Sequence, residues 1–260
     1  MPDLLLDNPL VNNVMFHPRS AIALTSNRPY THDGIVPTPD GEEIGYRLYD
    51  DPKAEVLIVF FHGNGEIAAD YEGIAPMFFA AGAALLIADF RGYGWSTGKP
   101  TGSKLLPDGE AVVDGLERVL QKHDVKPKTR PIYVMGRSLG SAPATHIARR
   151  YQDRFAGLII ESGFASGRDW LTSKAGLASL FKGVKDPFPN AENIADTDLP
   201  LLVIHGEHDT LIPPDHGKRL YDASTHADKT LLIARKAGHN DLLMVATNAY
   251  FDHVKRFVSG

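Results

Sequence analysis

The sequence predicts an α/β fold in which a mostly parallel central sheet carries helices on both of its faces. Short, nearly continuous apolar runs recur along the chain, and longer amphipathic stretches separate them. Continuous apolar runs rich in Val and Ile are typical of strands that are buried on both faces. Strands that alternate with helices indicate βαβ units with right-handed crossovers.

Each element can be assigned from this pattern. The apolar runs predict strands at residues 56–61, 83–88, 132–135, 158–160, 201–204 and 231–233. The amphipathic stretches predict helices at residues 71–81, 108–122, 141–151, 214–224 and 241–258. Two earlier extended segments, 35–38 and 43–48, flank the turn sequence Pro-Asp-Gly at 39–41, which predicts an antiparallel hairpin at the leading edge of the sheet.

Composition and charge exclude several classes of protein. The 260 residues are 43% hydrophobic and 23% charged, so we expect one globular domain over residues 1–260. The net charge of -5 and the lack of a basic stretch argue against a nucleic-acid partner. With no cysteine, the chain has no disulfide, no thiolate nucleophile and no cysteine-ligated metal. No signal peptide and no 18-residue apolar run is found, so we expect a cytoplasmic protein without a membrane span.

Two segments depart from the alternation of strands and helices. Residues 1–35 form a lead-in that either packs on the body or mediates contacts. Residues 163–199 contain two short helical candidates, 169–180 and 190–195, on either side of the sequence Lys-Asp-Pro-Phe-Pro. This second segment is compatible with a small cap over a functional site or with a plain long crossover.

The strongest local motif is Gly-Arg-Ser-Leu-Gly at residues 136–140, which follows a predicted strand and precedes a predicted helix. That context is the one a nucleophile elbow requires, because the sharp turn exposes the serine hydroxyl above the sheet. Side chains at Gly136 or Gly140 would crowd the neighbouring backbone. We therefore expect Ser138 to be a nucleophile, with the amide of Leu139 at a helix start beside it.

A serine hydroxyl needs a base that takes its proton, and the base needs an acid that orients it. His239 lies in the loop between the last predicted strand and the final helix, where the base is expected. Asp209 lies between Ser138 and His239 in sequence, just after an apolar strand, and is the expected acid. Glu161, at the end of the preceding strand, is the main alternative to Asp209, whereas Asp241 is expected to cap the last helix.

The loop after the first long strand, His-Gly-Asn-Gly-Glu at residues 62–66, is expected to complete an oxyanion hole. The amides of Asn64 and Leu139 are the expected pair of donors, although the sequence leaves open which amide between Gly63 and Gly65 points inward.

His62 is interpreted as a structural loop histidine. The Gly-rich loop at 89–96 lacks the lysine and the helix of a phosphate loop, and no metal or dinucleotide motif is found. We therefore expect no cofactor and no metal.

Taken together, five ordered blocks resemble the α/β-hydrolase superfamily, and more narrowly its small serine hydrolases, which are grouped with serine aminopeptidase-like and α/β-hydrolase-domain proteins. The blocks are His-Gly-Asn-Gly at 62–65, Asp-Phe-Arg-Gly-Tyr-Gly-Trp-Ser at 89–96, Gly-Arg-Ser-Leu-Gly at 136–140, His-Gly-Glu-His-Asp at 205–209 and Gly-His-Asn at 238–240. The resemblance implies the α/β-hydrolase fold and maps the family's nucleophile, acid and base onto Ser138, Asp209 and His239.

The resemblance also implies a reaction class: hydrolysis of an ester, a thioester or an amide in a small-molecule or acyl substrate. Carboxylesterase and thioesterase activities are favoured. The chain has no counterpart of the cysteine-rich region that anchors some acyl-protein thioesterases, which argues against a membrane-bound depalmitoylase. A non-catalytic ligand receptor on the same fold and a C–C bond hydrolase are the alternatives. The physiological substrate and the oligomeric state are not encoded in any motif of the chain.

Overall fold

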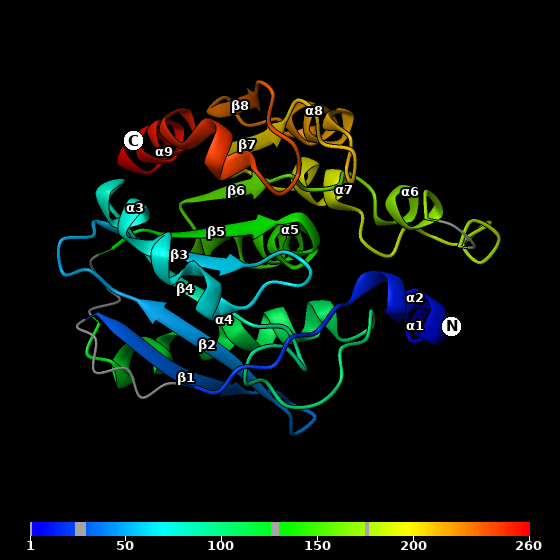
Figure 1. The fold of residues 1–260 in the computed structure, drawn as a ribbon, viewed down its shortest axis with the longest axis horizontal. Coiled ribbons are helices and arrows are strands. Elements are labelled where there is room, and N and C mark those ends of the chain that lie inside the picture. The colour runs from blue at the N-terminus through cyan, green and yellow to red at the C-terminus, as the bar shows by residue number, and fades with distance from the viewer. Residues whose placement is uncertain (1, 24–29, 126–129, 175–176) are drawn as a thin grey trace.

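The computed structural model describes residues 2–23, 30–125, 130–174 and 177–260, and these contain one open eight-stranded sheet (Figure 1). Its strand order is β1-β2-β4-β3-β5-β6-β7-β8. The strands are β1 (Thr31–Pro37), β2 (Glu43–Tyr49), β3 (Val56–Phe61), β4 (Ala83–Ala88), β5 (Ile132–Arg137), β6 (Gly157–Glu161), β7 (Leu201–Gly206) and β8 (Lys229–Ala234). Every predicted strand is present, and the α/β-hydrolase fold expected from the resemblance is confirmed.

The direction of the strands changes once across the sheet. β1 pairs antiparallel with β2, and β2 pairs antiparallel with β4, so the predicted hairpin forms the leading edge. From β4 onward all neighbouring strands are parallel. Because parallel strands end on the same edge, the loops that follow β3, β5, β6, β7 and β8 gather at one end of the sheet.

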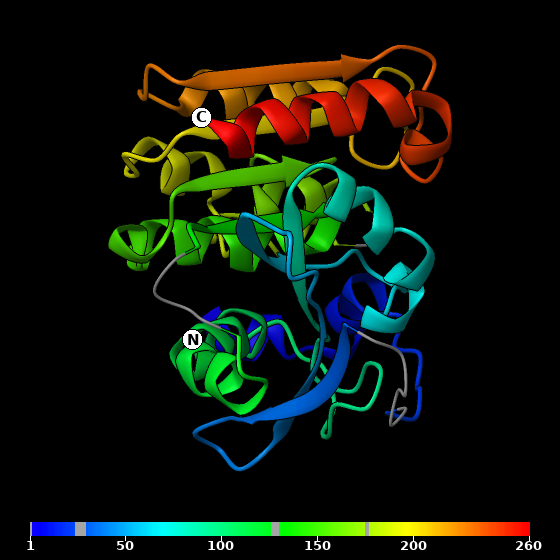
Figure 2. The same ribbon diagram turned by 90° about the vertical axis from the view of Figure 1, so that its left-hand side faces the viewer.

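Helices cover both faces of the sheet. They are α3 (Ala75–Ala80), α4 (Leu105–Lys122), α5 (Ser141–Arg150), α7 (Asn190–Ala195), α8 (Pro214–Ala223) and α9 (Leu242–Ser259), with short 3₁₀ turns at η1 (Ala68–Gly73), η2 (Ser138–Gly140) and η3 (Gln152–Arg154). α9 runs alongside β8 and β7, as Figure 2 shows. No helix among the described residues is both long enough and apolar enough to cross a bilayer.

Burial on both faces explains the continuous apolar runs. In β3, Leu57 and Val59 belong to one hydrophobic cluster, and Ile58 and Phe60 belong to the cluster on the opposite face. Successive side chains of a strand point to opposite faces, so a strand that is covered on both sides must be apolar at every position. The continuous apolar runs of the central strands therefore indicate that helices cover both faces of the sheet.

The N-terminal lead-in packs on the body of the protein. Its helices α1 (Pro2–Leu6) and α2 (Pro9–Met15) are followed by an extended stretch in which Ser20 forms a parallel bridge with Gly94. Val11 and Met15 on α2 are fully buried in the same cluster as the central strands. α2 lies beyond the carboxyl ends of β5 and β6, on the same side as α6 (Gly167–Thr172) (Figure 1).

The segment 163–199 divides into two parts. α7 agrees with its predicted bounds, but the helix predicted over 169–180 is α6 and ends at Thr172, where the hydroxyl of Ser173 donates to the carbonyl of Trp170. Part of that predicted helix, residues 175–176, lies outside the described residues. Phe181 and Phe188 are buried in the main cluster, so much of the segment packs down onto the body.

Met15→Ala should lower the free energy of unfolding by about 2–5 kcal/mol, because a fully buried thioether side chain is replaced by a cavity. Leu10→Ala, on the same helix but 61% exposed, is the matched control and should change it by no more than about 0.5 kcal/mol. Urea titration of both variants measures the difference. Equal losses would contradict the packing of α2 on the body.

Candidate active site

Ser138 lies at a strained turn between β5 and α5. Its φ of 51° is in the left-handed region, which is costly for a residue other than glycine. The flanking glycines permit this turn. A Cβ on Gly136 would lie 2.7 Å from the Cβ of Ala144, and one on Gly140 would lie 2.7 Å from the carbonyl oxygen of His62. The elbow therefore packs directly against the loop that follows β3.

The structure brings Ser138, His239 and Asp209 together from three different strand ends. The Nε2 atom of His239 is 2.9 Å from the hydroxyl oxygen of Ser138, and its Nδ1 atom is 2.7 Å from a carboxylate oxygen of Asp209. Asp209 follows β7, and His239 lies in the loop between β8 and α9. All three residues are buried. These contacts have the geometry that acyl transfer would require of a nucleophile, a base and an orienting acid.

The surroundings of Asp209 fix the direction of these hydrogen bonds. Burial opposes ionisation of Asp209, but hydrogen bonding from His205, His239 and the Ile212 amide outweighs it and holds the pKa of Asp209 well below its usual range. The other carboxylate oxygen accepts the backbone amides of Leu211 and Ile212 at 2.9 Å and 2.8 Å. An ionised carboxylate can only accept, so His239 must donate through Nδ1–H. Its Nε2 lone pair is then free to accept the hydroxyl proton of Ser138.

Glu161, the alternative acid, has other partners. Its two carboxylate oxygens accept hydrogen bonds from Arg137 Nε and the Tyr250 hydroxyl, at 2.9 Å and 2.8 Å. Asp241 occupies the predicted cap position before α9, but its side chain accepts the amide of Gly238 instead of an amide in the first turn of the helix. The carboxylate that contacts His239 is that of Asp209.

Of the two residues expected to form the oxyanion hole, one lies in the elbow and the other in the loop after β3. Leu139 is buried in the 3₁₀ turn that follows Ser138. Asn64 lies in the loop after β3, where its side-chain oxygen accepts the amide of His17 at 2.8 Å and the hydroxyl of Tyr93 at 2.7 Å. These bonds tie the loop to the N-terminal lead-in and to the Gly-rich loop after β4.

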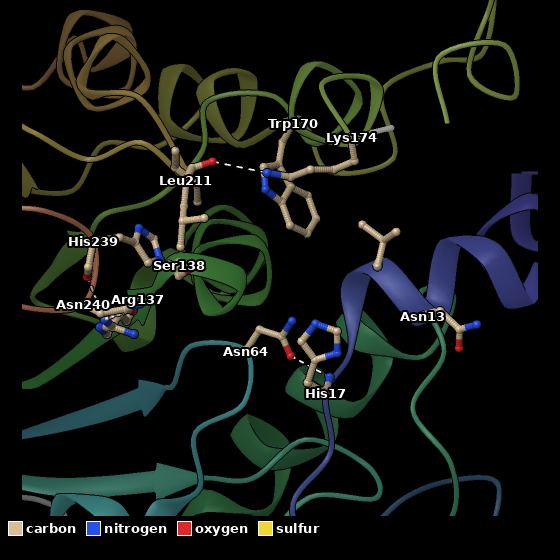
Figure 3. A pocket seen from close by; sticks show the side chains of 12 residues that line it. Asn13, His17, Asn64, Arg137, Ser138, Trp170, Lys174, Leu211, His239 and Asn240 are labelled. Atoms are coloured by element: carbon tan, nitrogen blue, oxygen red, sulfur yellow. Dashed lines mark hydrogen bonds between the residues drawn. The ribbon is translucent and has the colours of Figure 1, made fainter. Parts of the chain in front are cut away.

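An open pocket of about 520 Å³ lies over Ser138 (Figure 3). Trp170 and Lys174 lie on one side of it, and Asn64 and His17 lie on the opposite side. The pocket is lined by Asn13, Val14, His17, Asn64, Arg137, Ser138, Trp170, Lys174, Leu211, Ile212, His239 and Asn240. Both segments that depart from the strand–helix alternation therefore contribute to it: the lead-in through α2 and residue 17, and residues 163–199 through α6 and Lys174.

Sequence reasoning did not find the contribution of the lead-in. A signal was present, since Val11 and Met15 are four residues apart and share one helix face that packs inward. Nothing in that pattern reveals which part of the body α2 covers. Arg137 was also missed, because the middle positions of the elbow motif carry no rule of their own.

The interpretation of His62 and of the Gly-rich loop as structural agrees with their contacts. His62 is fully buried, with its Nε2 atom 3.2 Å from Asp89 at the end of β4. Arg91 in the same loop pairs with Asp108 and Asp40. Among the residues that the structure describes, no group of three or more His, Asp or Glu side chains is arranged to hold a metal ion.

Comparison with known proteins assigns the chain to a family. The family model described as serine aminopeptidase, S33, matches residues 51–177 and 169–243. The chain belongs to this family. It is 31% identical over 212 residues to human alpha/beta hydrolase domain-containing protein 17B, a match that covers 80% of this chain and 68% of that protein. Mouse alpha/beta hydrolase domain-containing protein 17C is 30% identical, with 80% of this chain and 61% of that protein covered.

Solved structures show the same fold. The Pyrococcus furiosus esterase Pf2001 matches with a TM-score of 0.72 and 19% identity, covering 94% of this chain and 97% of that one. Est1E from Butyrivibrio proteoclasticus matches with a TM-score of 0.66 and 16% identity, covering 86% and 96%. At this level of identity the likeness concerns the fold. Together with the family match, it identifies this S33 family member as an α/β-hydrolase.

Asp209→Asn should make the free energy of unfolding less dependent on pH in the acid range. Because the pKa of Asp209 is lower in the folded protein than in the unfolded chain, its ionisation stabilises the fold above about pH 4. This contribution is lost as the pH falls towards the folded-state pKa. Urea titrations at a series of pH values should show a steeper loss of unfolding free energy below about pH 4 for wild type than for the variant. Parallel curves would contradict the lowered pKa.

Proposed function

We propose that this S33 family member is a serine hydrolase that cleaves esters or thioesters through an acyl-enzyme on Ser138. The observation that carries the proposal is the pair of contacts of His239, 2.9 Å to Ser138 and 2.7 Å to Asp209. A serine hydroxyl becomes nucleophilic when a neutral imidazole can accept its proton. The low pKa of Asp209 keeps its carboxylate ionised, so this carboxylate accepts Nδ1–H and leaves Nε2 of His239 facing the hydroxyl of Ser138.

In the proposed mechanism, Ser138 attacks the carbonyl carbon of the substrate while His239 accepts the hydroxyl proton. The amides of Asn64 and Leu139 stabilise the oxyanion of the tetrahedral intermediate. His239 then donates its proton to the leaving oxygen or sulfur, and the acyl-enzyme forms. Asp209 stays ionised throughout and stabilises the imidazolium.

Deacylation repeats these steps with water as the nucleophile. His239 takes a proton from the water molecule, which attacks the ester carbonyl of acylated Ser138. Collapse of the second intermediate returns the proton to the Ser138 oxygen and releases the carboxylic acid. None of these steps requires a redox group, since the acyl group and protons are transferred without any change of oxidation state.

The lining of the pocket supports an apolar acyl group as the part of the substrate that is recognised. Val14, Trp170, Leu211 and Ile212 surround the approach to Ser138. Trp170 is held in place by stacking on Phe164, with ring centroids 5.0 Å apart and an angle of 4° between the planes. A rigid aromatic surface beside the nucleophile provides contact area for an acyl chain at little entropic cost.

Ser138→Ala should abolish hydrolysis of p-nitrophenyl esters and labelling by a fluorophosphonate, with a loss of roughly 10⁶-fold in turnover. Ser162→Ala is the matched control: Ser162 is also buried and also has a positive φ, but its hydroxyl has no hydrogen-bond partner among the described residues. We expect this control to label and turn over at the wild-type rate. Comparing kcat/KM for an oxygen ester and a thioester that carry the same acyl group would then show which of the two bonds the protein prefers to cleave.

Three results would contradict the proposal. Wild type that neither labels nor turns over any ester would indicate a ligand receptor with an inactive serine. Labelling that persists in Ser138→Ala would place the nucleophile at another serine. Turnover confined to carbon–carbon substrates would keep Ser138 but change the reaction class.

Trp170→Ala should move the optimum of a p-nitrophenyl ester series towards longer acyl chains, because it removes an aromatic surface from the pocket. Trp95→Ala is the control. Trp95 is the other tryptophan of the chain, it donates to the carbonyl of Gly34, and it does not line the pocket. The ratio of kcat/KM values along the series measures the shift. An unchanged optimum in Trp170→Ala would exclude α6 from acyl recognition.

A further inference from the structure

Arg137, the residue before the proposed nucleophile, links the carboxyl ends of four strands: β5, on which it lies, β6, and the loops that follow β3 and β8. Its Nε atom donates to Glu161 at the end of β6 at 2.9 Å, and its Nη1 atom donates to Glu66 in the loop after β3. Its Nη2 atom donates to the main-chain carbonyl of His239 at 2.9 Å, and lies 3.5 Å from the side-chain oxygen of Asn240. One guanidinium thus joins the elbow to the loops that hold the oxyanion donor and the base.

Both carboxylates that bind Arg137 are themselves anchored. The second oxygen of Glu161 accepts the hydroxyl of Tyr250 on α9 at 2.8 Å. The second oxygen of Glu66 accepts the hydroxyl of Tyr71 at 2.7 Å and the amide of Gly63 at 2.8 Å. Burial raises the pKa of both tyrosines, so each hydroxyl keeps its proton and donates. The guanidinium is therefore held in one orientation from both sides.

The contact with the carbonyl of His239 matters because the base is otherwise held mainly through its ring. Asp209 and Ser138 contact the two imidazole nitrogens. The backbone at residues 237–241 belongs to no helix or strand, and its carbonyl at Ala237 accepts the amide of His208 at 2.8 Å. At His239 itself, the contact of the carbonyl with Arg137 holds the main chain from which the ring extends.

We infer that Arg137 is a positioning residue that sets the location of His239 over Ser138 by binding the carbonyl of His239 while the two anchored carboxylates orient its guanidinium. This inference rests on the proposed function. Arginine suits the task because its planar fork donates in several fixed directions, whereas lysine offers a single charged nitrogen on a flexible stem. Displacement of a catalytic group by about 1 Å can cost roughly 10²-fold in rate.

Arg137 also lines the pocket, so the alternative role is direct binding of an anionic group on the substrate. The geometry argues against it, because Nε, Nη1 and Nη2 all donate to acceptors of the protein. The two roles predict different kinetics. A positioning residue changes kcat, while a residue that binds substrate equally in the ground state and the transition state changes KM.

The test compares Arg137→Lys and Arg137→Met with wild type in steady-state ester hydrolysis and in the rate of fluorophosphonate labelling. We expect kcat and the labelling rate to fall by roughly 10²-fold in Arg137→Met, with KM changed by less than about twofold. Arg137→Lys keeps a cation between the carboxylates and should still lose kcat. A rise in KM at unchanged kcat, or unchanged kinetics, would overturn the inference.

Arg47→Lys is the matched control, because Arg47 is a buried arginine that pairs with both carboxylate oxygens of Asp33 at 2.6 Å and lies outside the pocket. Arg47→Lys should lower the melting temperature and leave kcat unchanged.

If neither Arg137 variant folds, Glu161→Gln tests the same inference. It keeps the size of the side chain and weakens the ion pair that orients the guanidinium, so kcat should fall several-fold at constant KM, and an unchanged kcat would overturn the inference.

The outcome also separates the two proposals. Ser138→Ala that retains activity contradicts the serine mechanism, whatever Arg137 does. Ser138→Ala without activity, combined with wild-type kcat in Arg137→Lys and Arg137→Met, contradicts only the role of Arg137.

Discussion

Parallel pairing of β3, β5, β6, β7 and β8 ends these strands on one edge of the sheet, and every side chain of the proposed active site depends on that alignment. Ser138 follows β5, Asp209 follows β7 and His239 follows β8, so residues as much as 101 positions apart in the chain meet within hydrogen-bond distance. The ladder is rigid because helices bury both faces, and a rigid ladder holds its loops at fixed separations. Packing of the sheet thus provides the geometry that the chemistry uses.

Asp209 and Glu161 are buried carboxylates at this same edge with different partners, and the partners determine what each carboxylate can do. Asp209 accepts two backbone amides and the imidazole of His239, so it is available to orient a base. Glu161 lies one strand away and is bound by Arg137 and Tyr250, so its oxygens are already occupied. A buried ion pair of this kind adds little net stability, because desolvation offsets the attraction. Its contribution is to fix the direction of a guanidinium that contacts the backbone of the base.

The pocket is assembled from segments outside the central sheet. α2 provides Val14, α6 provides Trp170, and the two helices lie on the same side of the strand ends. The tie between His17 and Asn64 connects the lead-in with the loop expected to form the oxyanion hole. α2 and His17 therefore help to shape the site, although they lie outside the region that the S33 family model matches.

The sequence by itself determined the strands, most of the helices that alternate with them, the elbow at Ser138 and the regions that hold the proposed acid and base. These features are largely local: burial on both faces makes a strand continuously apolar, and the sharp turn at Ser138 needs a small residue at Gly136, where a Cβ would meet Gly140 and Ala144. The tertiary structure decided that Asp209 and not Glu161 contacts His239, that the lead-in lines the pocket, and that Arg137 joins the ends of four strands. Those contacts depend on which strand ends are neighbours in the sheet, and strand order is a non-local property that no short stretch of residues encodes.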